Sequence, residues 1–309
     1  MRERELIEFL HTLSAEAPRE WLDLGIGDDA AVARMHGESA VITTDMLIEK
    51  THYLAKTSPA KIGWKAIARC LSDLAGMAAE PLCTVAAVSF PPDAKTSFCR
   101  KMLHSLAEAA EKLSAPLIGG DISSGTDVTV LAVTAIGTPP PEGCVRRDTA
   151  QPGDSICVTG KLGESVKSGR HLVFTPRINE GREARTNYNL HAMIDISDGV
   201  STDLNHICEA SGLGATIQAA KMPISAEAIS GEERQNSALN SALNEGEDYE
   251  LLFCLPSDEA RVVEEKGLAG TPVSVIGSMT AETDCVIVLK DGTQRSLRPG
   301  GWEHKTNET

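Results

Sequence analysis

The sequence predicts an α+β protein of two domains, each built on a mixed β-sheet with α-helices. At about 100–200 residues per domain, 309 residues suggest two domains. Helical and strand-like apolar patterns alternate through both halves of the chain. Between the halves, the proline-rich segment Thr138–Gly143 lacks backbone donors for a β-ladder and interrupts the pattern. We therefore place a junction near residues 138–150, with an N-terminal domain over 1–140 and a C-terminal domain over 150–305.

The N-terminal half predicts the element order β-α-β-α-β-β after a first helix. That first helix has apolar residues at helical spacing, namely Leu6, Phe9, Leu10 and Leu13. The clearest helix follows a strand over 40–45: Ser58 is placed to cap it, Pro59 suits its first position, and Pro81 forbids its continuation. The remaining elements are a strand over 84–90, a helix over 96–113 and strands over 116–118 and 128–136.

The C-terminal half begins with a strand over 153–160 and an irregular stretch. It continues with a strand over 192–196, a helix over 202–211, strands over 215–219 and 249–255, a helix over 257–266, and strands over 273–276 and 285–289. These helices are expected to cover the second sheet.

The composition excludes several classes of partner. Lys and Arg number 29 against 44 Asp and Glu, a net charge of −15, which disfavours nucleic acid and anionic membrane surfaces. The eight cysteines form no Cys-x-x-Cys pair and are typical of buried thiols in a reducing cytoplasm. No run of 18 apolar residues occurs, so we expect a cytoplasmic protein and neither a secreted nor a membrane-spanning one.

Aspartates beside glycines or hydroxyls follow several predicted strands. They occur in Gly27-Asp-Asp29, Thr43-Thr-Asp45, Gly119-Gly-Asp121 and Asp195-Ile-Ser-Asp-Gly199. Strand ends meet at one edge of a sheet, and two carboxylates about 4–5 Å apart repel by roughly 3–4 kcal/mol at an effective dielectric constant of about 20. Convergence would therefore imply a hard cation, Mg²⁺ or Mn²⁺. Each fragment alone is more often a turn or a helix cap, so the metal hypothesis depends on their number.

The usual phosphate-binding loops are missing from the sequence. Neither G-x-x-x-x-G-K-[ST] nor G-x-G-x-x-G occurs, so phosphate contacts would come from glycine amides, metal ions and basic residues such as Arg147. For Arg147, a solvated loop charge is about as plausible.

Six motifs in order resemble the thiamine-monophosphate kinase family, a relative of aminoimidazole-ribonucleotide synthetase, selenophosphate synthetase and the hydrogenase maturation dehydratase. The motifs are Gly25-Ile-Gly-Asp-Asp-Ala-Ala-Val32, Thr43-Thr-Asp-Met-Leu-Ile-Glu-Lys-Thr-His52, Lys65-Ala-(x)4-Leu-Ser-Asp-Leu-Ala-Gly-Met-(x)3-Pro81, Gly119-Gly-Asp121, Ile194-Asp-Ile-Ser-Asp-Gly199 and Gly246-Glu-Asp-Tyr-Glu-Leu251. The resemblance runs from about residue 20 to 304, and Trp302 near the end favours the kinase over its relatives.

The resemblance implies ATP-dependent transfer of a phosphoryl group onto thiamine phosphate, giving thiamine diphosphate, without a covalent nucleophile. It implies several Mg²⁺ ions bound by Asp29, Thr43, Thr44, Asp45, Asp73, Asp121, Asp195 and Asp198. By the same comparison, ATP is held by Gly120, Asp121, Arg147 and Ser197, and the substrate by His52, Glu247 and Trp302. It also implies a homodimer whose N-terminal domains join in a shared sheet or barrel.

Two departures from the family pattern stand out. Glu245 replaces the first of two glycines before the Glu-Asp-Tyr-Glu motif, and a helix-length segment between Gly163 and Arg170 is missing. We expect residues 172–174 to fold back over the second sheet, because a lasting apolar patch would promote aggregation.

Two alternatives remain at this point. One is another ATP-using enzyme of the same superfamily, of the selenophosphate synthetase or hydrogenase-maturation type. The other is a degenerate module that binds nucleotide or thiamine phosphate without turnover, which the missing segment motivates.

Overall fold

The computed structural model describes residues 20–35, 38–226 and 235–302. The helix that we predict from Leu6 to Leu13 lies outside these ranges. Within them the chain forms two mixed sheets with helices, which confirms the predicted fold class. No helix of the described part is both long and apolar enough to cross a membrane.

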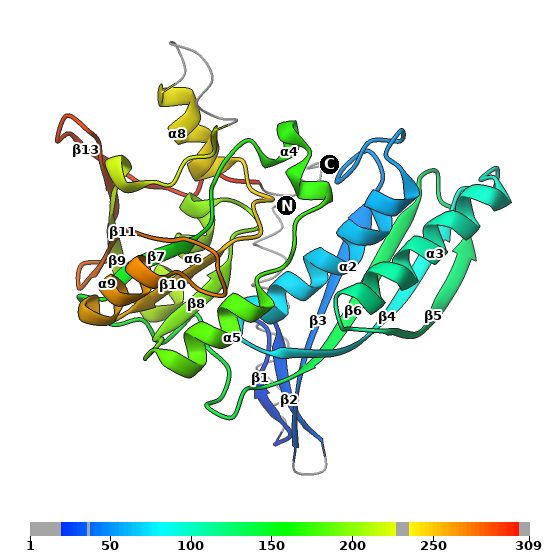
Figure 1. The fold of residues 1–309 in the computed structure, drawn as a ribbon, viewed down its shortest axis with the longest axis horizontal. Helices are drawn as coiled ribbons and strands as arrows, with labels where there is room; N and C mark the ends of the chain where they lie inside the picture. Colours follow the sequence, from blue (N-terminus) through cyan, green and yellow to red (C-terminus); the bar gives the residue numbers. More distant parts are fainter. Residues whose placement is uncertain (1–19, 36–37, 227–234, 303–309) are drawn as a thin grey trace, which may run out of the picture.

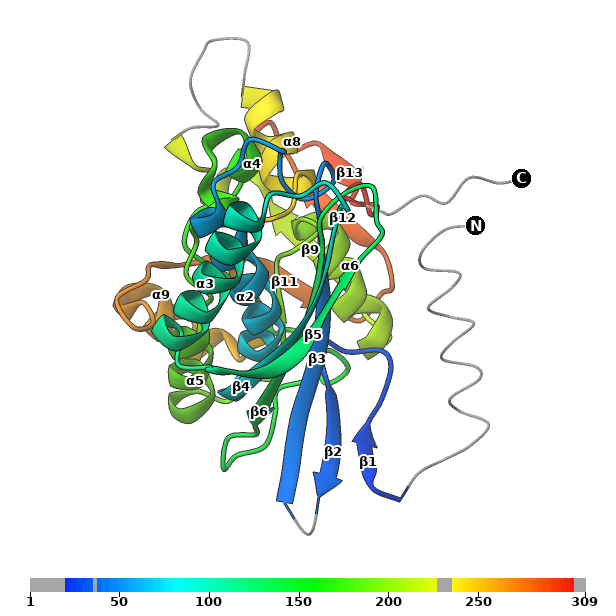
Figure 2. The ribbon, with the colours of Figure 1, turned by 90° about the vertical axis from the view of Figure 1, so that its right-hand side faces the viewer.

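The first sheet has six strands in the order β1-β2-β3-β6-β4-β5. Its strands are β1 (Leu22–Leu24), β2 (Ala31–Met35), β3 (Glu38–Ile48), β4 (Glu80–Phe90), β5 (Leu117–Ser124) and β6 (Val130–Thr138). The pair β4–β5 is parallel and the other pairs are antiparallel. Helices α2 (Pro59–Gly76) and α3 (Thr96–Lys112) pack on one face of this sheet (Figures 1 and 2).

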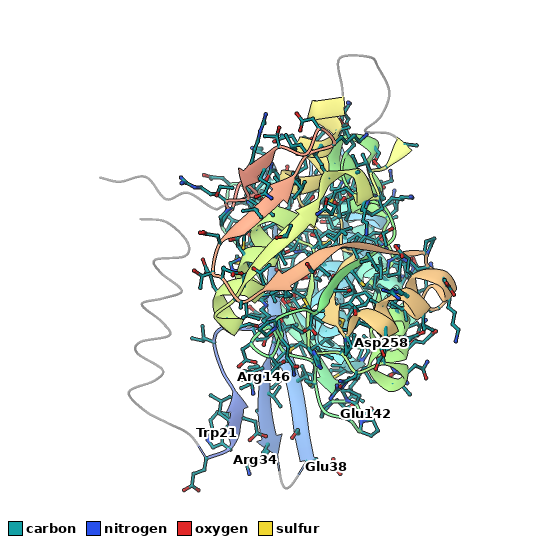
Figure 3. The ribbon with its side chains drawn as sticks, turned by 90° about the vertical axis from the view of Figure 1, so that its left-hand side faces the viewer. Trp21, Arg34, Glu38, Glu142, Arg146 and Asp258 are labelled. Carbon is teal, nitrogen blue, oxygen red and sulfur yellow. The ribbon has the colours of Figure 1, made fainter. Side chains whose placement is uncertain are left out.

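Strands β2 and β3 form a hairpin that projects beyond the rest of the molecule, with Arg34 and Glu38 near its tip (Figure 3). The other end of β3 runs back beneath α2 (Figure 1). The residues that the sequence singles out on β3, Thr43 to Asp45, therefore lie away from the tip.

Helix α2 forms as the apolar spacing predicts, although its ends differ in detail. The carbonyl of Ser58 accepts N–H groups of Lys61 and Ile62, but the Ser58 side chain makes no capping bond with any described residue. The helix ends at Gly76, before Pro81, where Ala78 turns the chain with φ of +57°. Its apolar side chains Ile62, Ile67, Leu71 and Leu74 are fully buried in the first core.

The second sheet has seven strands in the order β13-β12-β9-β11-β7-β10-β8. Its strands are β7 (Ser155–Thr159), β8 (Ala192–Asp195), β9 (Gly214–Gln218), β10 (Leu251–Leu255), β11 (Val273–Thr280), β12 (Cys285–Val288) and β13 (Gln294–Ser296). Only β9 and β12 run parallel among the described pairs. Helices α6 (Val200–Ser211) and α8 (Gln235–Asn244) share one core with it, and α5 (Ile178–Asn187) and α9 (Ser257–Lys266) share the other.

Helix α2 also joins the two halves of the molecule. Besides the first sheet, it packs against α5, β8 and β10. Its approach to α5 is so close that a Cβ on Gly181 would lie 2.6 Å from the carbonyl oxygen of Ala75. The polar side chains near the C-terminal end of α2 therefore face elements of the second sheet.

The shortened segment after Gly163 folds back, but not over the second sheet as we expect from the sequence: Leu172 packs against the first core, and Phe174 packs against α2 and Tyr249. It contains α4 (Ser165–Ser168) and the 3₁₀ turn η1 (Arg170–Leu172); a second 3₁₀ turn, η2 (Ala219–Lys221), follows β9. Phe174 is buried and stacks on Tyr249 with ring centroids 3.9 Å apart, while Trp64 on α2 donates its indole N–H to the Phe174 carbonyl at 2.6 Å. Val166 and Val173 remain about half exposed.

Candidate functional site

Three aspartates converge between the two sheets. Asp29 lies in the loop between β1 and β2, Asp73 on α2, and Asp195 at the end of β8. One carboxylate oxygen of each lies within 4.8 Å of the others. Gly76 makes this approach feasible, because a Cβ there would stand 2.4 Å from Oδ2 of Asp29 and 3.0 Å from the backbone nitrogen of Asp195.

Burial and mutual repulsion act on these three carboxyl groups. Burial raises the pKa of Asp29 to about 8, although the Arg147 guanidinium partly offsets the effect. Burial also raises the pKa of Asp195 to about 6, against a hydrogen bond from the Ser72 hydroxyl at 2.5 Å. The pKa of Asp73 is raised well above its usual value by burial and by Asp45, Asp195 and Asp29.

The donor set of this cluster fits a hard divalent cation. Oδ2 of Asp29 is buried and has no hydrogen-bond partner among the described residues. The Thr43 hydroxyl lies 2.5 Å from Oδ2 of Asp73, which adds a neutral oxygen to three carboxylates. Oxygen donors in such number are what Mg²⁺ and Mn²⁺ prefer, and a cation would offset the burial and the repulsion that together raise the pKa values.

Arg147 lies beside the cluster. Its guanidinium donates to Oδ1 of Asp29, and its backbone N–H donates to Oδ2 of Asp28 at 3.1 Å. The segment between β6 and β7 therefore brings one cation to the acids.

Asp45 has a protein partner of its own. Its two oxygens accept Nε–H and Nη2–H of Arg69 on α2, each at 2.9 Å. This bidentate pair places Asp45 on the same face of the sheet as Asp73, but among the described residues the close cluster does not include it. A cation at Asp45 would have to compete with Arg69.

Asp198 belongs to a second group, with Asp203 and His206 of α6. Oδ2 of Asp203 accepts the backbone N–H groups of Asp198 and Gly199 at 3.2 and 3.0 Å, which satisfies the start of α6. Helix capping therefore accounts for the buried position of the Asp203 carboxylate. Asp198 lies at the margin of the first cluster, three residues after Asp195.

Thr44 and Asp121 lie on the opposite face of the first sheet. The β-register puts Met46, Ala132, Ala87 and Asp121 in one row across the strands, and Asp45, Val133, Ala86 and Gly120 in the next. Val133 and Ala86 are buried beneath the helices, whereas Met46, Ala87 and Asp121 are exposed. At about 4.8 Å per strand spacing, Asp121 on β5 is also roughly 14 Å from β3. Within one chain, Asp121 is therefore separate from the three converging aspartates.

Two of the three predicted substrate residues, His52 and Glu247, contact a buried lysine. Nζ of Lys65 lies 2.7 Å from both carboxylate oxygens of Glu247 and 2.8 Å from the carbonyl of His52. Nδ1 of His52 accepts the backbone N–H of Ile48 at 2.9 Å. The backbone N–H groups of Glu247 and Trp302 donate to the carbonyls of the adjacent residues Ser197 and Asp198, at 2.7 and 3.2 Å.

Sequence reasoning missed three polar residues of α2 at this junction. Lys65, Arg69 and Ser72 are spaced by four and three residues, so with Asp73 they form one polar stripe along the helix. They contact Glu247, Asp45 and Asp195 respectively. The signal in the sequence is a lysine and an arginine within a largely apolar helix, spaced so that both lie on one face of it.

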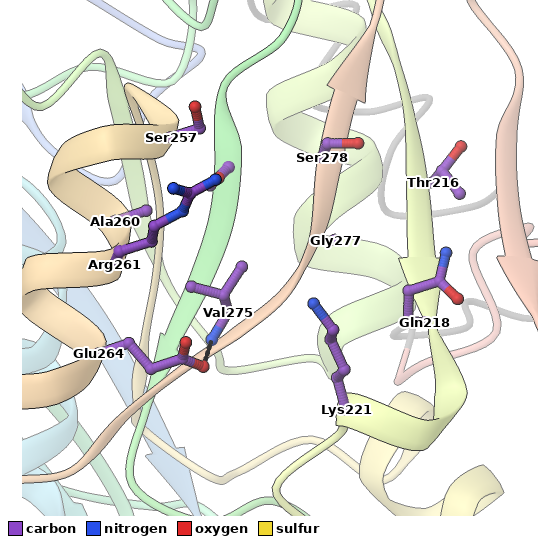
Figure 4. Close-up of a pocket in the computed structure, with 11 residues that line it drawn as sticks. Thr216, Gln218, Lys221, Ser257, Ala260, Arg261, Glu264, Val275, Gly277 and Ser278 are labelled. Carbon is purple, nitrogen blue, oxygen red and sulfur yellow. Dashed lines mark hydrogen bonds between the residues drawn. The ribbon is translucent and has the colours of Figure 1, made fainter.

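A separate pocket of about 420 Å³ lies on the second sheet, between α9, β11 and the end of β9 (Figure 4). Lys221 and Arg261 line it, and the Glu264 carboxylate accepts the Val275 N–H at 2.9 Å. Its described lining contains none of the residues that the motifs single out. The candidate site is therefore the aspartate cluster with the Lys65 group.

Comparison with known proteins assigns the family. Two family models match the chain: the AIR synthase related protein N-terminal domain over residues 27–138 and the corresponding C-terminal domain over 151–290. Thiamine-monophosphate kinase of Rhodopirellula baltica is 32% identical, over 98% of this chain and 97% of the relative. The Escherichia coli K12 enzyme of the same name is 34% identical, over 92% of each chain. The chain belongs to the thiamine-monophosphate kinase family.

Solved structures agree with membership of the thiamine-monophosphate kinase family. The structure of AaThiL complexed with AMPPCP and TMP superposes with a TM-score of 0.81 at 28% identity, covering 99% of both chains. The thiamine-monophosphate kinase of Stenotrophomonas maltophilia K279a gives a TM-score of 0.73 at 31% identity, covering 94% of this chain and 98% of that one. The hydrogenase maturation protein HypE in complex with ATP shares the fold, with a TM-score of 0.70 at 18% identity.

The departure at Glu245 from the thiamine-monophosphate kinase pattern leaves the local backbone intact. Gly246 has φ of +68°, and a Cβ there would meet the Ser197 carbonyl at 2.6 Å, so this position requires glycine. Glu245 is not among the residues with positive φ. Its Oε2 accepts the backbone N–H of Glu164 at 2.9 Å, so the residue that departs from the pattern contacts the segment that is shortened.

Proposed function

We propose that this protein transfers the γ-phosphoryl group of ATP to thiamine phosphate, giving thiamine diphosphate. Family membership supports this activity. The structural observation that carries it is the convergence of Asp29, Asp73 and Asp195, with an unpartnered buried oxygen, beside Arg147. Transfer between two phosphate groups requires positioning and neutralisation of charge, and no covalent nucleophile.

Magnesium ions are proposed at the acidic residues. Asp29, Asp73, Asp195 and Thr43 would form the central site, with Asp45, Asp198, Thr44 and Asp121 contributing further ligands. When bound, Mg²⁺ would neutralise the phosphates that a protein of net charge −15 otherwise repels. The bidentate contact with Arg69 holds the Asp45 carboxylate on the sheet, and Mg²⁺ binding at Asp45 would displace Arg69.

We assign ATP to Gly120, Asp121, Arg147 and Ser197, and thiamine phosphate to His52, Glu247 and Trp302. The thiazolium ring of the acceptor is a cation, which suits the Glu247 carboxylate and the aromatic face of Trp302. In this assignment the N-terminal domain binds ATP and Mg²⁺, and the C-terminal domain completes the nucleotide and substrate sites.

The protein is further proposed to act as a cytoplasmic homodimer joined through the first sheet. Helices α2 and α3 pack on one face, while the row of Met46, Ala87 and Asp121 on the other face is exposed. Asp121 would lie at the interface of such a dimer. This placement would explain why a proposed ligand stands apart from the central cluster within one chain.

Release of ADP with and without thiamine phosphate tests the proposed activity. We expect release that depends on thiamine phosphate and on Mg²⁺ and is abolished by a chelator. Release that requires a different acceptor would indicate another activity of the superfamily. Tight binding of thiamine phosphate without release would indicate a degenerate binding module.

A further inference from the structure

Lys65 has an unusually enclosed ammonium group. Its side chain is fully buried, although it begins on a helix whose N-terminal turn is partly exposed. An ammonium has three N–H donors, and three acceptor oxygens lie within hydrogen-bond distance: both carboxylate oxygens of Glu247 and the His52 carbonyl. The donors and acceptors are matched, and the lysine links α2, the β3–α2 loop and the loop before β10.

The partner of Lys65 is enclosed on one side only. The Glu247 side chain is 20% exposed, whereas that of Lys65 is 0% exposed. Each carboxylate oxygen keeps acceptor capacity beyond its bond to Nζ. Lys65 therefore fixes Glu247 from within the protein and leaves its other side open to a ligand.

The backbone of Glu247 also requires support. Its φ is +54°, in the left-handed region that a residue other than glycine rarely adopts. Its N–H donates to the Ser197 carbonyl at 2.7 Å, and its carbonyl accepts the Ser165 hydroxyl at 2.7 Å. Backbone and side chain are thus both held, and such fixed geometry at an accessible carboxylate is typical of a binding group.

We propose that Lys65 is a positioning residue for the acceptor site, which fixes the Glu247 carboxylate and the His52 backbone so that they receive the cationic end of thiamine phosphate. The inference rests on the proposed function, which places the substrate at His52 and Glu247. Burial lowers the pKa of Lys65 to about 8 and Glu247 opposes that shift, which is consistent with an ammonium kept charged by its partner.

Calorimetric titration of the full-length protein with thiamine phosphate, and separately with a non-hydrolysable ATP analogue in the presence of Mg²⁺, tests the proposal. We expect Lys65→Met to weaken thiamine phosphate binding at least tenfold and to change binding of the ATP analogue less than twofold. Lys65→Gln, which retains a polar end, should show the same selectivity. The matched control is Lys61→Met, one turn earlier on α2 and exposed, which should bind both ligands as the wild type does.

A double-mutant cycle separates positioning from general structural support. If Lys65 acts mainly through Glu247, then Lys65→Met should add much less to the loss caused by Glu247→Gln than it costs in the wild type, and the remainder belongs to the His52 backbone. Equal loss of both ligands, or additive losses in the cycle, would overturn the positioning role. Wild-type binding by both Lys65 variants would also overturn it, while leaving the proposed function intact if the wild type releases ADP. Failure of the wild type to bind thiamine phosphate would overturn both.

Discussion

Asp29 and Asp45 are the same residue type in very different surroundings. Asp29 has a buried oxygen without a partner and two acidic neighbours, whereas both oxygens of Asp45 bind Arg69. The sequence predicts both as metal ligands from their similar positions beside small or hydroxyl residues. It could not show that Asp45 has a protein partner, because Arg69 lies 24 residues away and comes close only when α2 packs on β3.

The stability of the metal-free protein should fall as pH rises. Aspartate titrates near 3.9 in an unfolded chain, but the pKa is about 8 for Asp29 and about 6 for Asp195 in the folded protein. The folded state therefore binds more protons, so the stabilisation is complete below about pH 4 and is lost as pH rises through 6 and 8. We expect the Tm in a chelator to decrease from pH 5 to pH 8.5.

Magnesium should reverse this trend, raising the Tm more at pH 8.5 than at pH 5, because it binds the ionised carboxylates. Differential scanning calorimetry with EDTA or Mg²⁺ measures both effects. A Tm of the metal-free protein that rises over this range would contradict the cluster as described.

Substitution by asparagine should affect the stability of the protein differently at Asp29 and at Asp45. Asp29→Asn is expected to leave the metal-free protein as stable as the wild type at pH 7 or more stable, because burial raises the pKa of Asp29 to about 8, so the wild-type carboxyl must take up a proton on folding whereas the amide needs none. Asp45→Asn removes the charge that pairs with the largely buried Arg69, and should lower the free energy of unfolding by about 1.5–3 kcal/mol. Both variants should lose phosphoryl transfer. Urea denaturation measures the free energy of unfolding of each variant. Equal stabilities of the two variants would contradict the difference in surroundings between Asp29 and Asp45.

Trp302→Ala addresses the other end of the acceptor site. Trp302 is about half exposed and its backbone is anchored to Asp198. An aromatic contact with a desolvated cation contributes about 2 kcal/mol, so thiamine phosphate should bind roughly 30-fold more weakly, with little change for ATP. The KM values for the two substrates measure this. Parallel increases in both would mean that Trp302 serves packing alone.

At the scale of elements, the spacing of apolar residues predicts those helices and strands that bury a single apolar face. Helix α2 follows its apolar spacing, but the sequence predicts an irregular stretch where α5 forms, because the buried face of α5 consists of Glu180, Gly181 and Ala184. Strand β5 continues through Gly119–Asp121, farther than expected, since backbone pairing with β4 determines it and its side chains are mostly exposed. Strands β1 and β13, three residues each, have no detectable period.

The shortened segment should resist proteolysis because it is docked. Phe174 holds it through the stack on Tyr249, and Arg170 through the Asp248 carboxylate. Phe174→Ala should increase the rate of native tryptic cleavage after Arg170 at least tenfold, since cleavage requires local opening. Val173→Ala, in the same segment but half exposed, should leave the rate unchanged. Rapid cleavage of the wild type at Arg170 would contradict the docked position.

At the scale of the whole molecule, strand pairing separates residues that the sequence motifs place side by side. Strand residues alternate between the two faces of a sheet, so Thr43 and Asp45 face α2 while Thr44 and Asp121 face the opposite side. A motif read along the chain does not reveal this division, which depends on the pairing of β3, β6, β4 and β5. In the proposed homodimer, the face that carries Thr44 and Asp121 would contact the partner subunit.

The exposed face of the first sheet provides the test of that hypothesis. Met46→Glu places a charge in the row with Ala87 and Asp121, where an apolar interface between two copies would have to bury it without a partner. We expect light scattering to show a dimer for the wild type and a monomer for Met46→Glu. ADP release should fall at least tenfold if Asp121 functions at the interface. Val262→Glu, an exposed apolar position on α9, is the control and should change neither property. A monomeric wild type with full activity would show that one chain suffices, and that Asp121 is not a ligand of the site.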